Sequence, residues 1–143
     1  MIEIFLDSSV LIAASGSIEG ASFFIVQSAK KNHWQLLTSQ YCLAEVERNI
    51  GKLGSSAKMS WEKSIRSSVD VMPNVLSISK PLMLEASKDK PVLIGAIAAH
   101  AKFLLTLDRF DFKRILNTSV YGVEVLTPGN FLEKQRREKR LKE

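Results

Sequence analysis

The chain has 143 residues, 45% of them hydrophobic and 24% charged, and a formal net charge of +5. This length and balance predict one soluble globular domain with a substantial buried core. The longest apolar run, VLIGAIAA, is far too short to span a bilayer, and the N-terminus lacks the basic start and apolar stretch of a signal peptide. We therefore expect a cytoplasmic protein that makes no membrane contact.

Cysteine and histidine are nearly absent from the sequence. The single cysteine, Cys42, excludes an internal disulfide and a cysteine-based zinc cluster. The only histidines are His33 and His100, so there is no His-rich metal motif. Any metal site in this chain is therefore expected to consist of oxygen ligands.

The positive charge is concentrated at the C-terminus. Residues 133–143, EKQRREKRLKE, hold six Lys or Arg against three Glu and so supply +3 of the net +5. We divide the chain into one domain, residues 1–132, and a basic tail, residues 133–143. Such a tail could gather a polyanion, because neutralised phosphates release counterions, or it could be a solvated, partly helical end.

Predicted strands and helices alternate in the first half of the chain. Residues 2–6 read as a buried strand, and Ser8 or Ser9 as the N-cap of the helix that follows it. A second helix is predicted over residues 18–31 and a second strand over residues 34–38. Thr38 or Ser39 would then cap a third helix, which carries apolar residues at spacings of three and four.

The alternation continues in the second half. Residues 51–56, GKLGSS, predict a flexible connection. The elements predicted after it are a helix over 57–70, a strand over 75–78, a short helix over 81–87, a small-residue helix over 91–101, a strand over 103–106, a helix over 110–116, a strand over 123–126 and a helix from Pro128. Strands that alternate with helices indicate an α/β fold with a mainly parallel sheet covered on both faces.

Four carboxylates occupy equivalent places in this pattern. Asp7 follows the first strand, Glu45 lies on the helix after the second, Asp89 precedes the helix after the third, and Asp108 follows the fourth. Parallel strands place all these positions at one edge of the sheet, where ligands of open α/β sheets bind. Clustered acids need either a raised pKa or a cation, and oxygen ligands favour Mg²⁺ or Mn²⁺. The sequence therefore predicts a metal site that binds and hydrolyses a phosphodiester.

Each acid also has a structural explanation. Asp89 and Asp108 stand where helix caps stand, and Glu45 reads equally as a solvated helix residue. Asp7 is harder to explain this way, because a buried strand that ends in Asp needs a partner for the charge and no basic residue lies nearby in sequence.

Four segments of the chain carry a family resemblance: DSSVLIA, AEVERNI, KDKPVLIGAIAAHAKFLLTLDRFDF and VEVLTPGNFL. Together they resemble the PIN domain, a metal-dependent ribonuclease fold found in many toxins of toxin–antitoxin pairs. The resemblance implies a three-layer α/β/α fold with a five-stranded sheet in the order 3-2-1-4-5. It also implies that Asp7, Glu45, Asp89 and Asp108 form the catalytic metal site, with Asp111 as an accessory ligand. Many relatives have Asn where this chain has Ser9, which puts one secondary polar contact in doubt.

The leading functional hypothesis is a Mg²⁺- or Mn²⁺-dependent endoribonuclease that leaves 5′-phosphate and 3′-hydroxyl ends. A non-catalytic RNA-binding or adaptor module that keeps the fold is the first alternative. The second is a phosphotransferase or receiver-type domain, which would need paired acids after the first strand and a Lys after the last. The segments at these two places, DSS (residues 7–9) and TPG (residues 127–129), contain neither. The candidate partners are an RNA substrate, an antitoxin protein and a second copy of the chain in a homodimer.

Overall fold

The computed structural model describes residues 1–75, 78–79 and 90–143. Six strands form one sheet in the order β3-β2-β1-β4-β6-β5. All neighbouring pairs are parallel except the β5–β6 hairpin. The strands are β1 (Ile2–Leu6), β2 (Trp34–Ser39), β3 (Asp70–Met72), β4 (Phe103–Leu105), β5 (Ser119–Val120) and β6 (Val123–Leu126). The predicted parallel sheet and its order are confirmed, and the two-residue strand β5 is added at one edge.

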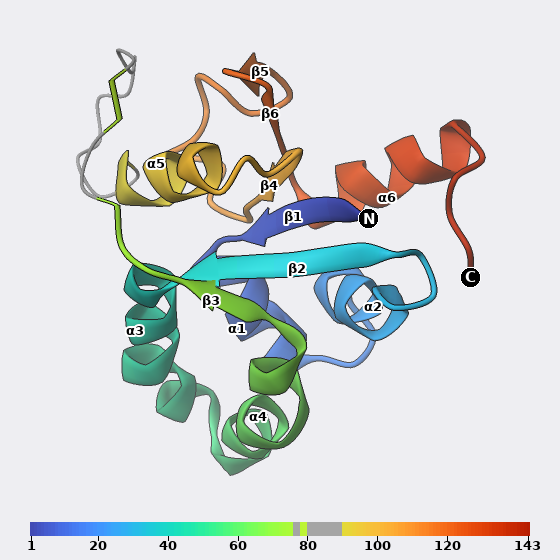
Figure 1. Ribbon diagram of the computed structural model, residues 1–143. Helices are drawn as coiled ribbons and strands as arrows, with labels where there is room; N and C mark the ends of the chain where they lie inside the picture. Colours follow the sequence, from blue (N-terminus) through green and yellow to red (C-terminus); the bar gives the residue numbers. More distant parts are fainter. Residues whose placement is uncertain (76–77, 80–89) are drawn as a thin grey trace.

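Helices cover both faces of this sheet (Figure 1). They are α1 (Ser8–Gly16), α2 (Ala21–Ser28), α3 (Gln40–Asn49), α4 (Ser55–Ser60), α5 (Lys90–Ala98) and α6 (Pro128–Arg137). Side chains alternate along β1, so Ile4 and Leu6 join the core under α1, α2, α4 and α6, while Phe5 joins the second core under α5. The fold is therefore the predicted three-layer α/β/α arrangement.

The small-residue helix α5 packs very close to the sheet. A Cβ at Gly95 would lie only 3.2 Å from the Phe5 ring, which is tighter than ordinary van der Waals contact. Glycine at this position therefore lets α5 lie directly on β1, next to the end of the strand that carries Asp7.

Several sequence predictions are wrong in detail. The N-cap of α1 is Asp7 rather than Ser8 or Ser9. The third strand is Asp70–Met72, earlier than the predicted 75–78, of which residues 76 and 77 lie outside the described residues. Residues 110–116 form consecutive turns and not a helix. The predicted cap Ser39 and the helix start at Pro128 are confirmed, and the predicted helix over 81–87 lies outside the described residues.

The segment predicted as a flexible connection is structured. Ile50–Leu53 form a 3₁₀ helix, and Gly54, whose φ of 101° favours glycine, precedes α4. The predicted helix over 57–70 divides into α4, a π-helical turn at Trp61–Ile65 and a 3₁₀ turn at Arg66–Ser68. The shorter helix leaves Asp70 free to begin β3, which pairs with the end of β2.

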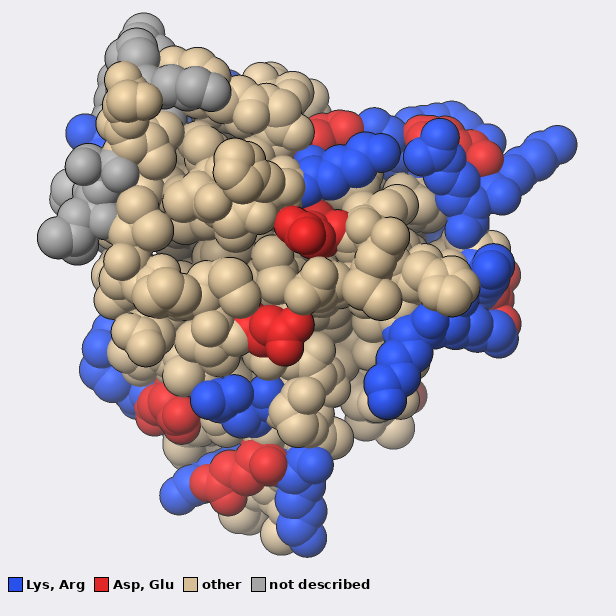
Figure 2. Space-filling model, viewed as in Figure 1, with Lys and Arg blue, Asp and Glu red and all other residues tan. Residues whose placement is uncertain are grey.

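The C-terminal segment folds back along the N-terminal ends of the strands. The backbone of Lys142 exchanges two hydrogen bonds with the Asn32 side chain, at 2.7 and 2.9 Å, just before β2 begins. Lys and Arg gather over α6 and this segment at the right of Figure 2. Helix α6 crosses residue 133, so the division into residues 1–132 and a tail of residues 133–143 stays a prediction.

Among the described residues, no single helix is long and apolar enough to cross a bilayer; only α1 and α2 taken together pass on length and composition, with a 93° bend between them.

Candidate active site

Asp7 is a buried carboxylate at the point where β1 becomes α1. Its exposed fraction is 6%. The carboxylate accepts hydrogen bonds from the Ser8 N–H at 2.8 Å, the Ser9 hydroxyl at 3.0 Å and the Thr106 hydroxyl at 2.8 Å. These donors hold the carboxylate in place, but none of them carries a positive charge. In the described part of the chain, therefore, Asp7 has hydrogen-bond partners without a compensating cation.

The surroundings of Asp7 disfavour its negative charge. Burial raises the pKa of the Asp7 carboxyl above its usual value, and the charge of Asp108 raises it further. The hydrogen bonds from Thr106, Ser9 and Ser8 lower the pKa but only partly offset the effect of burial. A positive ion beside Asp7 would oppose both causes of the upward shift.

Asp108 reaches the same place from the neighbouring strand β4. Its N–H donates to the Thr106 hydroxyl at 3.0 Å, and its Oδ1 accepts from the Asp111 N–H at 2.9 Å. Asp108 therefore caps a turn and not the helix that the sequence predicted, and it lies half-buried beside Asp7 as well. Because β1 and β4 are paired, the Thr106 hydroxyl links the two acids directly.

Glu45 comes from α3, the helix that follows β2. One turn earlier on the same face lie Tyr41 and Cys42, at spacings of four and three residues. The Cys42 Sγ is 4.0 Å from Oδ1 of Asp7. Burial, together with the charge of Asp7, raises the pKa of the Cys42 thiol to about 11. Cys42 is therefore a neutral thiol against the buried acid.

These elements meet at a cavity of about 100 Å³ beyond the C-terminal ends of the strands. Its walls are Asp7, Ser8, Ser9, Tyr41, Glu45, Val92, Asp108 and Asp111. Four of the five acids singled out from the sequence thus line one cavity. The fifth, Asp89, lies outside the described residues; Val92, three residues further on, lines the cavity.

Comparison with known proteins places this arrangement in a family. The sequence profile of the PIN domain matches residues 3–110, which is most of the chain and includes Asp7, Glu45 and Asp108. The chain belongs to the PIN domain family.

A solved structure has a similar fold. One chain in the crystal structure of VapBC2 from Rickettsia felis, bound to a DNA fragment from their promoter, superimposes with a TM-score of 0.61. The two chains are 16% identical, and the match covers 87% of this PIN domain and 97% of the other chain. No curated protein sequence matches the chain. At this identity the structural likeness supports the fold alone.

The donor chemistry of the cavity fits a hard divalent cation. Every charged group that lines it is a carboxylate, and carboxylate oxygens suit Mg²⁺ or Mn²⁺. Among the described residues, no three His, Cys, Asp or Glu side chains are close enough, as they lie, to ligate one ion. Mg²⁺ usually keeps several waters and binds through one or two carboxylates, so it does not need three protein ligands that reach the same point.

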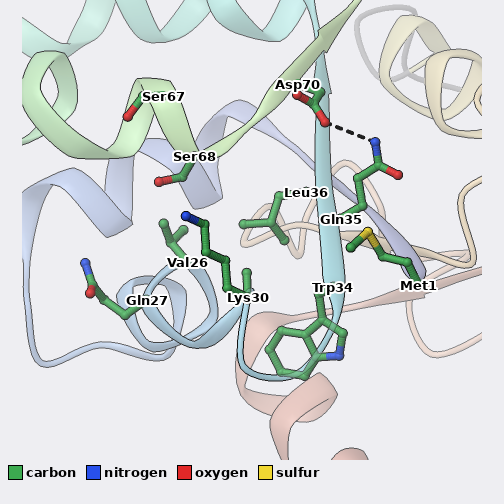
Figure 3. A pocket seen from close by; sticks show the side chains of 11 residues that line it. Met1, Val26, Gln27, Lys30, Trp34, Gln35, Leu36, Ser67, Ser68 and Asp70 are labelled. Carbon is green, nitrogen blue, oxygen red and sulfur yellow. Dashed lines mark hydrogen bonds between the residues drawn. The ribbon is translucent and has the colours of Figure 1, made fainter.

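A larger cavity of this PIN domain, of about 540 Å³, has a different character. It lies beside α2 and the beginning of β2, and its lining residues are drawn in Figure 3. Its two charged side chains are of opposite sign, Lys30 and Asp70, and Asp70 accepts a 3.0 Å hydrogen bond from Gln35. Because it contains no group of acids, it does not compete as a metal site.

Sequence reasoning missed two residues of the site, Tyr41 and Cys42. Their positions four and three residues before Glu45 on one helix were the available signal, since residues at these spacings share a helix face. Thr106 is a buried residue that directly follows β4. Its bond to Asp7 depends on the pairing of β1 with β4, which no local pattern reveals.

Proposed function

We propose that this protein is a Mg²⁺- or Mn²⁺-dependent endoribonuclease that hydrolyses RNA phosphodiester bonds and leaves 5′-phosphate and 3′-hydroxyl ends. The observation that carries the proposal is the buried Asp7 carboxylate, which has no cationic partner in the described part of the chain and shares one cavity with Glu45, Asp108 and Asp111. Membership of the PIN domain family supports it, because PIN domains are generally nucleases.

Asp7, Glu45, Asp108 and Asp111 would form the acidic site, with one or two of these carboxylates on the cation directly and the others on the waters that it keeps. Asp89 is proposed as a further member of this site. A divalent cation held there would polarise the phosphodiester, lower the pKa of the attacking water and stabilise the leaving oxygen. The chain's own part is to fix the acids before the substrate arrives. The Thr106 and Ser9 hydroxyls hold the Asp7 carboxylate, and the Asp111 N–H holds that of Asp108.

The charge around the cavity suits a polyanionic substrate. Arg109 and Lys113 are exposed and follow Asp108 within five residues. Cations at the rim can bind phosphates on either side of the scissile one, while the acids inside the cavity repel phosphate until a cation is present. Binding and cleavage are therefore expected to depend differently on divalent ions.

The test is cleavage of a 5′-labelled single-stranded RNA by the wild-type protein and by Asp7→Asn. Wild type should cut in Mg²⁺ or Mn²⁺ and not in EDTA, and Asp7→Asn should be inactive. Asp70→Asn is the matched control, because Asp70 lines the other cavity and should leave cleavage unchanged. Binding of RNA without cleavage in any divalent ion would reject the nuclease in favour of a non-catalytic RNA-binding or adaptor module.

We also propose that the protein acts in the cytoplasm as the toxin of a toxin–antitoxin pair. The support is its fold, which it shares with a chain of the VapBC2 assembly. Expression of the wild-type protein should arrest growth, and co-expression of a small protein encoded in the adjacent reading frame should relieve the arrest and co-purify with it. Sedimentation of the purified chain would test the proposed homodimer.

A further inference from the structure

Phe110 is a large aromatic side chain that the fold leaves in solvent, in the turn that carries two acids of the cavity. Its exposed fraction is 76%, against 1% for Phe112 two residues later. It stands between Asp108 and Asp111, both of which line the cavity. A single exposed apolar side chain is common on protein surfaces, so the exposure of Phe110 carries no argument by itself. What distinguishes Phe110 is its place in the chain between two acids of the proposed active site.

The exposure of Phe110 is fixed by the turns on either side of it. Asp108 caps the turn through the Asp111 N–H at 2.9 Å, and the buried side chains of Phe112 and Ile115 anchor the segment on the sheet. The Leu116 N–H also donates to the Phe112 carbonyl at 2.8 Å. The backbone on both sides of Phe110 is therefore held, and its ring is presented outward.

Positive charge accompanies the ring. The Lys113 Nζ lies 5.1 Å from the centroid of the Phe110 ring, a cation–π distance, and the Arg109 side chain is exposed next to it. With 76% of the residue exposed, Lys113 covers only part of the ring. An aromatic face beside two cations is the combination that binds single-stranded nucleic acid, because bases stack on the ring while the cations contact phosphates.

We propose that Phe110 is a stacking platform for an unpaired base of the RNA next to the scissile phosphate, with Lys113 and Arg109 on the neighbouring phosphates. The inference rests on the proposed ribonuclease function and narrows its substrate to RNA that is single-stranded at the site. Stacking on an aromatic ring tolerates every base, so Phe110 selects for an unpaired strand and not for a sequence. A base inside a duplex is already stacked and cannot use the platform.

The experiment measures binding without cleavage. A short single-stranded RNA containing the fluorescent base 2-aminopurine is titrated with protein in the absence of divalent ions. The variants are Phe110→Ala, Phe110→Tyr, which keeps the ring, and Ile18→Ala, a control whose side chain is exposed to a similar extent, 75%. Melting curves check that each variant is folded, which is expected because both side chains are exposed.

Phe110→Ala should bind single-stranded RNA about ten- to a hundredfold more weakly and lose the quenching of 2-aminopurine that stacking produces. Phe110→Tyr should keep both, Ile18→Ala should match wild type, and binding of the same RNA as a duplex should not depend on Phe110. The inference is overturned if Phe110→Ala binds like Ile18→Ala, or if it weakens duplex and single strand equally. The inference is also overturned if Phe110→Ala binds RNA like wild type and weakens only the binding of a protein partner.

The two proposals fail separately. If RNA binding depends on Phe110 but no divalent ion supports cleavage, the nuclease is rejected and the platform stands. If wild type cleaves RNA and Phe110→Ala binds and cleaves equally well, the nuclease stands and the platform is rejected.

Discussion

The Thr106 hydroxyl donates a 2.8 Å hydrogen bond to Oδ2 of Asp7, across 99 positions of the sequence. Both residues are buried, and the bond joins the ends of the paired strands β1 and β4. The same hydroxyl accepts from the Asp108 N–H at 3.0 Å. One threonine therefore sets the relative positions of the two acids that come from neighbouring strands.

Replacing Thr106 by Val removes this donor with little change in shape. We expect the metal-free protein to lose about 1.5–3 kcal/mol of its free energy of unfolding, because the bond is made to a carboxylate. The bond lowers the pKa of Asp7, so it favours the ionised form, and the loss should be largest above that pKa and shrink as pH falls. Urea unfolding between about pH 4 and pH 8 measures this.

Thr38→Val is the matched control for this measurement. Thr38 is equally buried, and its hydroxyl donates at 2.9 Å to the neutral Leu6 carbonyl. Thr38→Val should lower the free energy of unfolding by about 0.5–1.5 kcal/mol, and this decrease should not vary with pH between about pH 4 and pH 8. Identical pH dependence in the two variants would show that Thr106 contributes packing alone.

Asp7→Asn and Asp108→Asn should abolish RNA cleavage without destabilising the metal-free protein at neutral pH. The pKa of Asp7 is raised in the folded protein. Its carboxyl therefore adds to the free energy of unfolding at pH values below the pKa that it has in the unfolded chain, and this contribution is lost as the pH rises through the folded-state pKa. Asn at position 7 avoids this loss and can still bond the hydroxyls, which donate and accept. Melting curves with and without Mg²⁺ measure the effect.

In these melts, Mg²⁺ should raise the midpoint of wild type and leave Asp7→Asn unchanged. The stability difference between wild type and Asp7→Asn should disappear toward pH 3.8, the unperturbed pKa of the carboxyl. A large loss of stability in both metal-free variants at neutral pH would mean that the acids are structural, and the metal-site proposal would fail.

The Cys42 thiol should be unreactive in the native protein. It is fully buried, and its pKa of about 11 leaves almost no thiolate at neutral pH. A disulfide reagent at about pH 8 should modify it only after unfolding, since a free thiol ionises near pH 8.5. Asp7→Asn should lower the thiol pKa, because the charge of Asp7 helps to raise it. Rapid native labelling would contradict this burial.

The basic C-terminal segment should add affinity for RNA without changing the chemical step. It folds back beside Asn32 at the start of β2, and Asp7 follows the other end of the neighbouring strand β1. Five residues of strand separate these edges by about 17 Å. Neutralising its cations should weaken RNA binding and flatten the salt dependence of log affinity by a little under one unit per lost contact. The single-turnover rate at saturating RNA should not change.

This measurement is best made by substitution. Deletion from residue 133 onward would remove the end of α6 and with it Gln135, which is 2% exposed, so lost stability would obscure lost affinity. The variant carries Gln at Arg136, Arg137, Lys139 and Arg140. Its control carries Gln at Lys52, Lys58, Lys63 and Arg66. If the two variants bind alike at every salt concentration, the C-terminal segment does not bind RNA.

The sequence by itself determined the alternation of helices and strands, and therefore the parallel sheet and the edge at which its acids lie. These features follow from local periodicity, which persists whatever the chain packs against. The placing of Asp7, Glu45 and Asp108 at that edge needed only the rule that parallel strands end on one side. The sequence also indicated that α5 is a helix of small residues, of which Gly95 is one.

Only the tertiary structure decided which atoms meet. Strand β3 lies at Asp70–Met72 because that segment pairs with the end of β2, and residues 110–116 form turns because Phe112 and Ile115 are anchored on the second core. The bond from Thr106 and the thiol of Cys42 at Asp7 join residues far apart in the chain. Strand pairing and desolvation depend on the whole fold, so no local pattern carries them.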